Sequence, residues 1–363
     1  MGFIGQFKNP VVLLFVIFGL MFCTSGIVSR LYAEDSRETS QETQNTPSSE
    51  PVDNEAETTP DNNSGTSEQS ENSENNDSDP NSPPDPNSPL EMTNEEEMDD
   101  FSPRISTYLK INEAYEKLFN PNLVTDDGLV RYGNLRRKRN DLIQATNELK
   151  RLNPAVLMSL SKEQRIAFWI NTYNACTLKL IIDNYPIEPK LYMIFYPDNS
   201  IMQISGNWRT KHFFDIQGLE YNLEEIEQEF LMKRYKDPRL CFALSYASMG
   251  GAVLRNEPYA AEKLDEQLDD QVRKYLQSSK GFGLDKEKNI LHLSTLFSMY
   301  NHKEFFLNSD YAKIKKFRTR KPEEQAWLNF IINYLPKEDI RYLEAESFEV
   351  KLIKYDWLLN EAH

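Results

Sequence analysis

Apolar residues recur at helical spacing in several segments after residue 102. Residues 105–119 and 134–152 each place apolar side chains three and four positions apart, which predicts two amphipathic helices. Ser161 lies three residues before Gln164, a capping-box spacing that predicts the start of a third helix. That helix is apolar on nearly all sides, so it should be buried, and it should end before Pro186. Further helices are predicted at 222–234, 259–277, 322–335 and 338–344.

Strand signals are fewer. Residues 213–223 read as two short strands around Gln217 and Gly218, which predicts a hairpin. Residues 283–294 read as a second hairpin or as a strand after a turn, and residues 347–355 alternate apolar and polar positions like a strand. The predicted fold class is therefore α+β and helix-rich, a single globular domain over 102–363 with a small antiparallel sheet or hairpins.

The chain begins with a different pattern. Residues 11–23 are apolar and follow Lys8, and weaker apolar character continues to Val28. Residues 1–33 therefore fit either a signal peptide or an N-terminal membrane anchor through residues 11–28. Lipidation of Cys23 is disfavoured because large residues precede it. Both readings predict that the rest of the protein is secreted, or anchored in the inner membrane with the domain outside the cytoplasm.

Residues 34–101 are predicted to be a disordered acidic linker rich in Ser, Pro and Asn. Residues 34–100 hold 21 acidic residues against one arginine, and they lack Phe, Trp, Tyr and Ile. Such a segment buries too little apolar area to offset its conformational entropy. Residues 101–363 hold 38 basic and 36 acidic residues, so the net charge of −16 belongs to the linker. A nearly neutral domain does not favour nucleic acid as a partner.

Familiar catalytic and metal-binding motifs are missing from the sequence. We find no glycine-rich phosphate loop, no paired-cysteine metal spacing, no His-Glu-x-x-His helix and no Gly-x-Ser-x-Gly elbow. Of four histidines, His212 and His292 have no nearby ligand partner in sequence, so neither a metal nor a cofactor is predicted. Cys176 and Cys241 lie in apolar surroundings and are expected to be buried free thiols, with a disulfide as the alternative.

Residues 167–175 place polar side chains in the predicted buried helix. Asn171 and Asn174 are three apart and share a face. A buried amide without hydrogen bonds costs ~1–3 kcal/mol, so each should have a partner. The two asparagines either clamp a loop or line a cleft and orient a substrate.

Residues 237–254 place small residues after an apolar run. Ser245, Ser248, Gly250 and Gly251 permit close backbone approach. They form either a tight packing turn or a site where exposed amides bind an anion.

Taken in order, several motifs resemble the domain-of-unknown-function 547 family over most of residues 102–363. These are the segments 127–135, 167–175, 221–231, 237–248, 293–297 and 355–360. Members of that family typically have His where this chain has Gln228, and Cys where it has Tyr246 and Gly251. The resemblance thus implies a thiol nucleophile and its base, which this chain has replaced. Cys241 stands where the family often has His.

Two hypotheses follow. The first is a non-catalytic binding or scaffold domain on a tether, with an unknown ligand or protein partner and, if the anchor is retained, the membrane. The second is a hydrolase or transferase with Ser248 as nucleophile, Glu227 as acid or base, and Asn171 or Asn174 as orienting donors beside Gln228.

Overall fold

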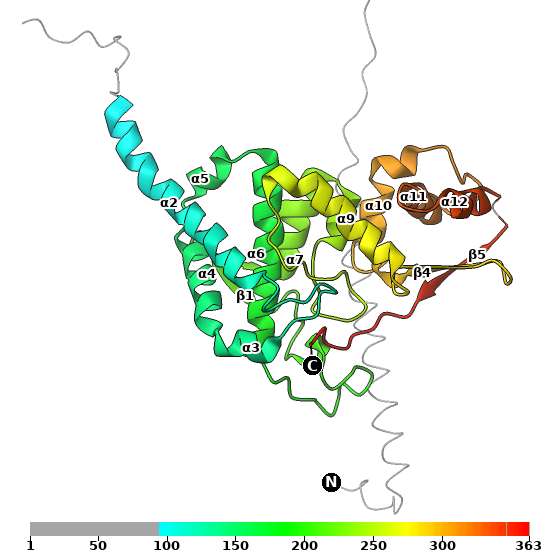
Figure 1. The fold of residues 1–363 in the computed structure, drawn as a ribbon, viewed down its shortest axis with the longest axis horizontal. Helices are drawn as coiled ribbons and strands as arrows, with labels where there is room; N and C mark the ends of the chain where they lie inside the picture. Colours follow the sequence, from blue (N-terminus) through cyan, green and yellow to red (C-terminus); the bar gives the residue numbers. More distant parts are fainter. Residues whose placement is uncertain (1–93, 346, 363) are drawn as a thin grey trace, which may run out of the picture. The chain divides into compact units, whose positions relative to one another are not determined.

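The computed structural model describes residues 94–345 and 347–362, and the predicted signal or anchor and most of the predicted linker lie outside them. The fold is helix-rich α+β, as predicted (Figure 1). Within the described ranges, no helix is both long enough and apolar enough to cross a membrane.

The N-terminal helices differ from the prediction at their ends. Helix α2 (Asn94–Leu118) begins inside the segment predicted to be linker. The helix predicted at 134–152 is two, α3 (Tyr132–Arg137) and α4 (Arg139–Arg151), separated at Lys138. Short α5 (Pro154–Ser159) follows, capped by Asn153.

Helix α6 (Lys162–Asp183) is the centre of the core (Figure 1). The predicted capping box is present: Gln164 N donates to Ser161 Oγ at 3.1 Å, and Ser161 N donates to the Gln164 side chain at 2.8 Å. Residues 166–178 of this helix are all buried, as its apolar pattern predicted. Later segments of the chain therefore pack against this helix.

The predicted hairpin at 213–223 is confirmed. Strands β1 (Phe213–Ile216) and β2 (Leu219–Asn222) pair antiparallel, and the turn residues Gln217 and Gly218 both have positive φ. That geometry matches the twist of a two-residue hairpin. The helical segment after it begins with a capping box at Asn222. It consists of α7 (Leu223–Glu225), a π-helical turn η2 (Ile226–Met232) and α8 (Lys233–Tyr235).

A second sheet contains three strands. Strands β3 (Phe282–Asp285) and β4 (Ile290–Ser294) form the second predicted hairpin. Strand β5 (Glu349–Ile353) joins β4 in parallel rather than antiparallel. The long connection from β4 to β5 allows this pairing because it contains α10 (His302–Leu307), α11 (Pro322–Ile331) and α12 (Lys337–Glu344).

Helix α9 (Leu264–Gln277) lies between the two regions (Figure 1). Short helical turns complete the fold: η1 (Ile201–Gln203), η3 (Pro238–Phe242), η4 (Ala261–Lys263), η5 (Thr295–Phe297) and η6 (Asp310–Lys313). After β5 the chain returns to the middle of the domain (Figure 1). There Gly250 N donates to Asp356 O at 2.8 Å and Val130 N donates to Asn360 O at 2.8 Å. The C-terminal segment is thus part of the core.

Candidate functional site: a buried polar cluster and an open pocket

Glu227 is the centre of a buried cluster of polar side chains. The carboxylate is fully buried on η2, and its Oε2 accepts a hydrogen bond from Arg209 Nη2 at 2.9 Å. Its Oε1 accepts from the Tyr246 hydroxyl at 3.1 Å and lies 3.2 Å from His302 Nε2. We call Arg209, Glu227, Tyr246 and His302 the buried polar cluster. Residues 93 positions apart in sequence meet in it.

The charges of this cluster stabilise one another. Burial alone would raise the pKa of Glu227, but the cations of Arg209 and His302 outweigh it and lower that pKa. Burial alone would lower the pKa of His302, but Cys241 and Glu227 raise it to about 10. Burial raises the pKa of the Cys241 thiol, so at neutral pH this thiol is uncharged and Glu227 is the anion that keeps His302 protonated.

The ring of His302 is fixed on both sides. Its Nδ1 lies 2.7 Å from the carbonyl oxygen of Leu296, which can only accept a hydrogen bond. Its Nε2 faces Glu227 and the Tyr246 hydroxyl. An imidazolium that donates from both nitrogens satisfies these partners, which agrees with the raised pKa.

Arg209 is held by more than its ion pair. Its Nη1 contacts Glu224 at 2.8 Å, and its guanidinium carbon lies 3.7 Å from the centre of the Tyr300 ring. The side chain of Arg209 is 3% exposed and that of Glu227 is 0% exposed. Removing either partner of such a pair would leave a charge buried without compensation.

Asn171 and Asn174 both hold backbone segments. Asn171 donates to the carbonyl of Tyr259 at 2.8 Å and accepts from the Tyr259 amide at 2.9 Å. Asn174 donates to the carbonyl of Ala243 at 3.0 Å and accepts from the amide of Ser245 at 2.8 Å. These are the contacts of a loop clamp, one of the two roles considered from the sequence.

The remaining candidates form two separate contacts. Gln228 Nε2 lies 3.4 Å from Glu227 Oε1 and 3.3 Å from Met232 Sδ. The hydroxyl of Ser248 lies 2.7 Å from the Tyr355 hydroxyl. A Cβ placed on Gly251 would lie 2.8 Å from the Tyr355 hydroxyl oxygen and 3.3 Å from Ser248 Oγ. Space for a side chain at position 251 is therefore already taken by Tyr355.

Cys241 interacts with His302 of the buried polar cluster through a side-chain hydrogen bond. Cys176 and Cys241 are buried free thiols. His212 Nε2 contacts the carbonyl of Ser205 at 2.9 Å, and His292 lies on β4 opposite Gly283. In the part of the chain that the structure describes, no group of three or more His, Cys, Asp or Glu side chains is arranged to hold a metal ion.

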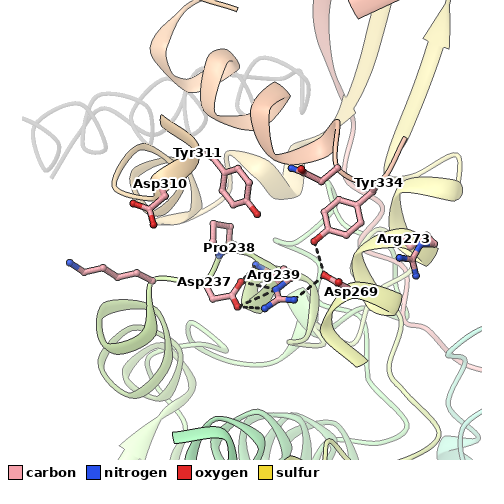
Figure 2. Close-up of a pocket in the computed structure, with 10 residues that line it drawn as sticks. Asp237, Pro238, Arg239, Asp269, Arg273, Asp310, Tyr311 and Tyr334 are labelled. Atoms are coloured by element: carbon pink, nitrogen blue, oxygen red, sulfur yellow. Dashed lines mark hydrogen bonds and ion pairs between the residues drawn. The ribbon is translucent and has the colours of Figure 1, made fainter. Parts of the chain in front are cut away.

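The domain also contains an open pocket of about 570 Å³ (Figure 2). It is bounded by the segment at the start of η3, by α9, by residues of η6 and by residues that follow α11. Its lining is Lys236, Asp237, Pro238, Arg239, Asp269, Arg273, Asp310, Tyr311, Asn333 and Tyr334. We call it the Arg239 pocket. Its volume lies in the range of ~300–1,000 Å³ that is typical of small-ligand sites.

Arg239 organises the acidic side of this pocket (Figure 2). Its Nη2 contacts Asp237 at 2.8 Å, and its Nη1 contacts Asp265 at 2.8 Å and Asp269 at 2.9 Å. Burial would lower the pKa of Arg239, but these carboxylates raise it, so the guanidinium is permanently charged. The Tyr334 hydroxyl donates to Asp269 at 2.9 Å. The carboxylates of Asp237 and Asp269 are thus held in place by ion pairs and hydrogen bonds within the protein.

Two tyrosine rings form the opposite side of the pocket (Figure 2). The centre of the Tyr311 ring lies 5.1 Å from that of Phe330, and the Tyr334 ring lies 5.4 Å from the same residue. Phe330 is fully buried. Both tyrosines therefore have an apolar support behind them and present a rigid, amphipathic surface to the pocket.

Residues 157–276 match the model of a family described as a protein of unknown function, DUF547. The match supports the resemblance to that family over residues 157–276. The match includes Arg209, Glu227, Ser248 and the Asp237–Arg239 side of the pocket, whereas His302 and the tyrosine side of the pocket lie beyond it. No curated protein and no solved structure matches the chain.

Sequence reasoning missed most of both sites. Arg209, His302 and Tyr355 have no spacing signal, because their partners lie far away in the chain. Arg239 had one signal, since it belongs to the segment 237–248 that carries the family resemblance. Glu227 was considered as an acid or base, and its catalytic role stays a prediction.

Proposed function

We propose that this protein is a non-catalytic binding protein whose DUF547-containing domain is held outside the cytoplasm. The apolar run at 11–23 supports that location, because it fits either a signal peptide or a membrane anchor. The ligand site in this proposal is the Arg239 pocket.

The Arg239 pocket is the observation on which the binding role rests. It is open, its carboxylates are fixed by Arg239, and its lining has three acidic and three basic side chains. Such a balance disfavours a strongly charged ligand. It suits a ligand whose groups both donate and accept hydrogen bonds, as sugar hydroxyls do. The rings of Tyr311 and Tyr334 add flat surfaces for the apolar face of a sugar. We therefore propose a hydroxyl-rich oligosaccharide as ligand.

The non-catalytic part of the proposal is supported by two of the three positions that the family resemblance marks as reactive, Gln228 and Gly251. Gly251 has no side chain, and Tyr355 fills the space that one would need. Gln228 cannot exchange a proton at neutral pH, and its amide contacts Glu227 and Met232. We expect the double variant Gln228→His with Gly251→Cys to remain inactive, because the introduced thiol would meet Tyr355.

Calorimetric titration of the full chain with chitotriose, a trimer of N-acetylglucosamine, tests the binding role. We expect saturable binding that weakens at least about tenfold, ~1.4 kcal/mol, in Tyr311→Ala. Tyr192→Ala is the matched control, because Tyr192 is 69% exposed and does not line the pocket. An absence of saturable binding to the wild type, or equal weakening by both variants, would contradict a sugar ligand in this pocket.

A hydrolase is the second candidate, and one observation favours it. Glu227, Tyr246 and His302 come within hydrogen-bond distance of each other, as acid–base groups in enzymes do. Against it, all three are buried, and Ser248 contacts Tyr355 rather than His302. Ester or glycoside turnover that is abolished by Ser248→Ala would favour this candidate, whereas unchanged turnover in Ser248→Ala would remove the serine role.

A further inference from the structure

The loop after α6 presents four large apolar side chains to solvent. Leu191 is 97% exposed, Tyr192 69%, Ile194 67% and Phe195 82%. Large apolar side chains are usually exposed singly, and a contiguous group marks a surface that contacts something else. We call residues 191–195 the apolar loop. The described core does not account for it, because the domain already buries the apolar faces of α6 without these side chains.

A buried glutamine fixes the backbone of this loop. Gln203 is 2% exposed, and its Nε2 lies within 3.4 Å of the carbonyl oxygens of Met193, Tyr196 and Pro197. Its Oε1 accepts a hydrogen bond from the amide of Lys190 at 2.9 Å. These contacts leave the loop few alternative conformations in which its apolar side chains could turn inward. The exposure of residues 191–195 is therefore a built feature of the fold.

The loop also rests on the C-terminal segment. The Tyr196 ring meets the Trp357 ring edge-on, with 6.3 Å between ring centres. Tyr196 thus faces the protein, whereas its neighbours Ile194 and Phe195 face solvent. The loop has an inner side that packs and an outer side that is apolar and unpaired.

We propose that residues 191–195 contact the surface of a phospholipid bilayer. Aliphatic and aromatic side chains of this kind enter the boundary between headgroups and acyl chains, to a depth of ~5–10 Å. Lys190 stands at the base of the loop, where its ammonium contacts Ser205 Oγ at 2.6 Å. Glu188 and Asp198 flank the same loop, so apolar burial rather than net charge drives the contact.

The choice of a bilayer over a second copy or another protein rests on the proposed function, which places the domain outside the cytoplasm with an apolar segment at 11–28. A flexible chain as long as the stretch from Arg30 to Asn94 spans about 40–50 Å. A membrane-anchored domain on such a chain meets the bilayer at an effective concentration near ~1 mM. Four side chains would bind a free protein to the bilayer only weakly. At that effective concentration the same four side chains are sufficient to keep the loop on the bilayer.

Fluorescence quenching by brominated lipids tests the contact on the full chain, mixed with phosphatidylcholine–phosphatidylglycerol vesicles. Phe195→Trp puts a reporter in the loop. Met158→Trp is the matched control, because Met158 is 72% exposed on α5, at the opposite end of α6. Helix α6, which has 22 residues and is about 33 Å long, lies between the two positions along the chain. Spectra of the parent chain are subtracted, since Trp357 lies near the loop.

We expect brominated lipid to quench the tryptophan of Phe195→Trp and to leave that of Met158→Trp unchanged. Adding Leu191→Ser and Ile194→Ser should abolish the quenching while the thermal unfolding midpoint stays the same. Absence of quenching in Phe195→Trp overturns the proposal, whether or not the chain sediments with the vesicles. Sedimentation after carbonate washing separately reports the anchor of the proposed function. A blue-shifted Phe195→Trp spectrum without lipid, together with a doubled mass, also overturns the proposal and assigns the loop to a second copy.

Discussion

Glu227→Gln is the most informative single substitution in the buried polar cluster. It keeps the size of the side chain and removes the negative charge that Arg209 and His302 share. Removing one partner of a buried ion pair costs ~3–5 kcal/mol, because the other charge stays buried and uncompensated. We expect the lower end of that range, since His302 can release its proton when its anion is gone. The expected loss is about 3 kcal/mol of unfolding free energy, or ~6–12 °C in the midpoint for a domain of this size.

The effect should depend on pH with a definite sign. The folded pKa of His302 is raised above its ordinary value of 6.5 by Glu227, so its contribution to stability is complete below pH 6.5 and is lost as the pH rises through the folded value. The pKa of Glu227 is lowered from 4.5, so its contribution is present above pH 4.5 and is lost as the pH falls through the folded value. The stability difference between wild type and Glu227→Gln should therefore be largest between these two unfolded values.

Urea unfolding across this pH range measures the difference, with Glu229→Gln as control. Glu229→Gln is the same substitution at a position two residues from Glu227. The side chain of Glu229 is 54% exposed and forms an ion pair with exposed Lys233. We expect a change within ~0.5 kcal/mol there. If Glu227→Gln is as stable as Glu229→Gln at pH 6, the reasoning about the buried polar cluster is wrong.

Three further substitutions have expected outcomes. Asn174→Ala removes two buried hydrogen bonds and should lower the unfolding free energy by ~2–4 kcal/mol in urea titrations; equal stability would contradict the loop-clamp role. Gly251→Cys should lower the unfolding free energy by ~1–3 kcal/mol through overpacking. Adding Tyr355→Phe should restore part of that stability in thermal melts, because it removes the hydroxyl that the new side chain would contact. Gln203→Ala should speed hydrogen exchange at the amides of residues 190–196 specifically, and unchanged exchange there would refute its anchoring of the apolar loop.

Local signals predicted the elements that depend on neighbouring residues. The capping box at Ser161, the buried helix after it and the hairpin turn at Gln217 and Gly218 are written in short stretches of sequence. The parallel pairing of β5 with β4 could not be predicted from a short stretch of sequence. Three helices separate the two strands, and no local signal specifies that β5 pairs with β4.

The buried polar cluster and the Arg239 pocket were also hard to predict, because their residues are far apart in the sequence. Glu227 stands among Glu224, Glu225 and Glu229, a pattern typical of a solvated helix face, yet it is fully buried. A π-helical turn at Ile226–Met232 and Arg209 from a distant loop make that burial possible. His302 looked like any of four histidines until the fold brought it to Glu227, 75 positions away. Contacts of this range leave no periodic trace in a single sequence.

The most direct test of the account is a crystal structure of the chain with chitotriose bound. The account predicts an intact trimer in the Arg239 pocket, stacked on Tyr311 or Tyr334 and hydrogen-bonded to the carboxylate of Asp269. It also predicts that Tyr355 keeps its contact with Ser248. A sugar bound beside Ser248 and Gly251, or a cleaved product there, would contradict the claim that this domain binds without catalysing.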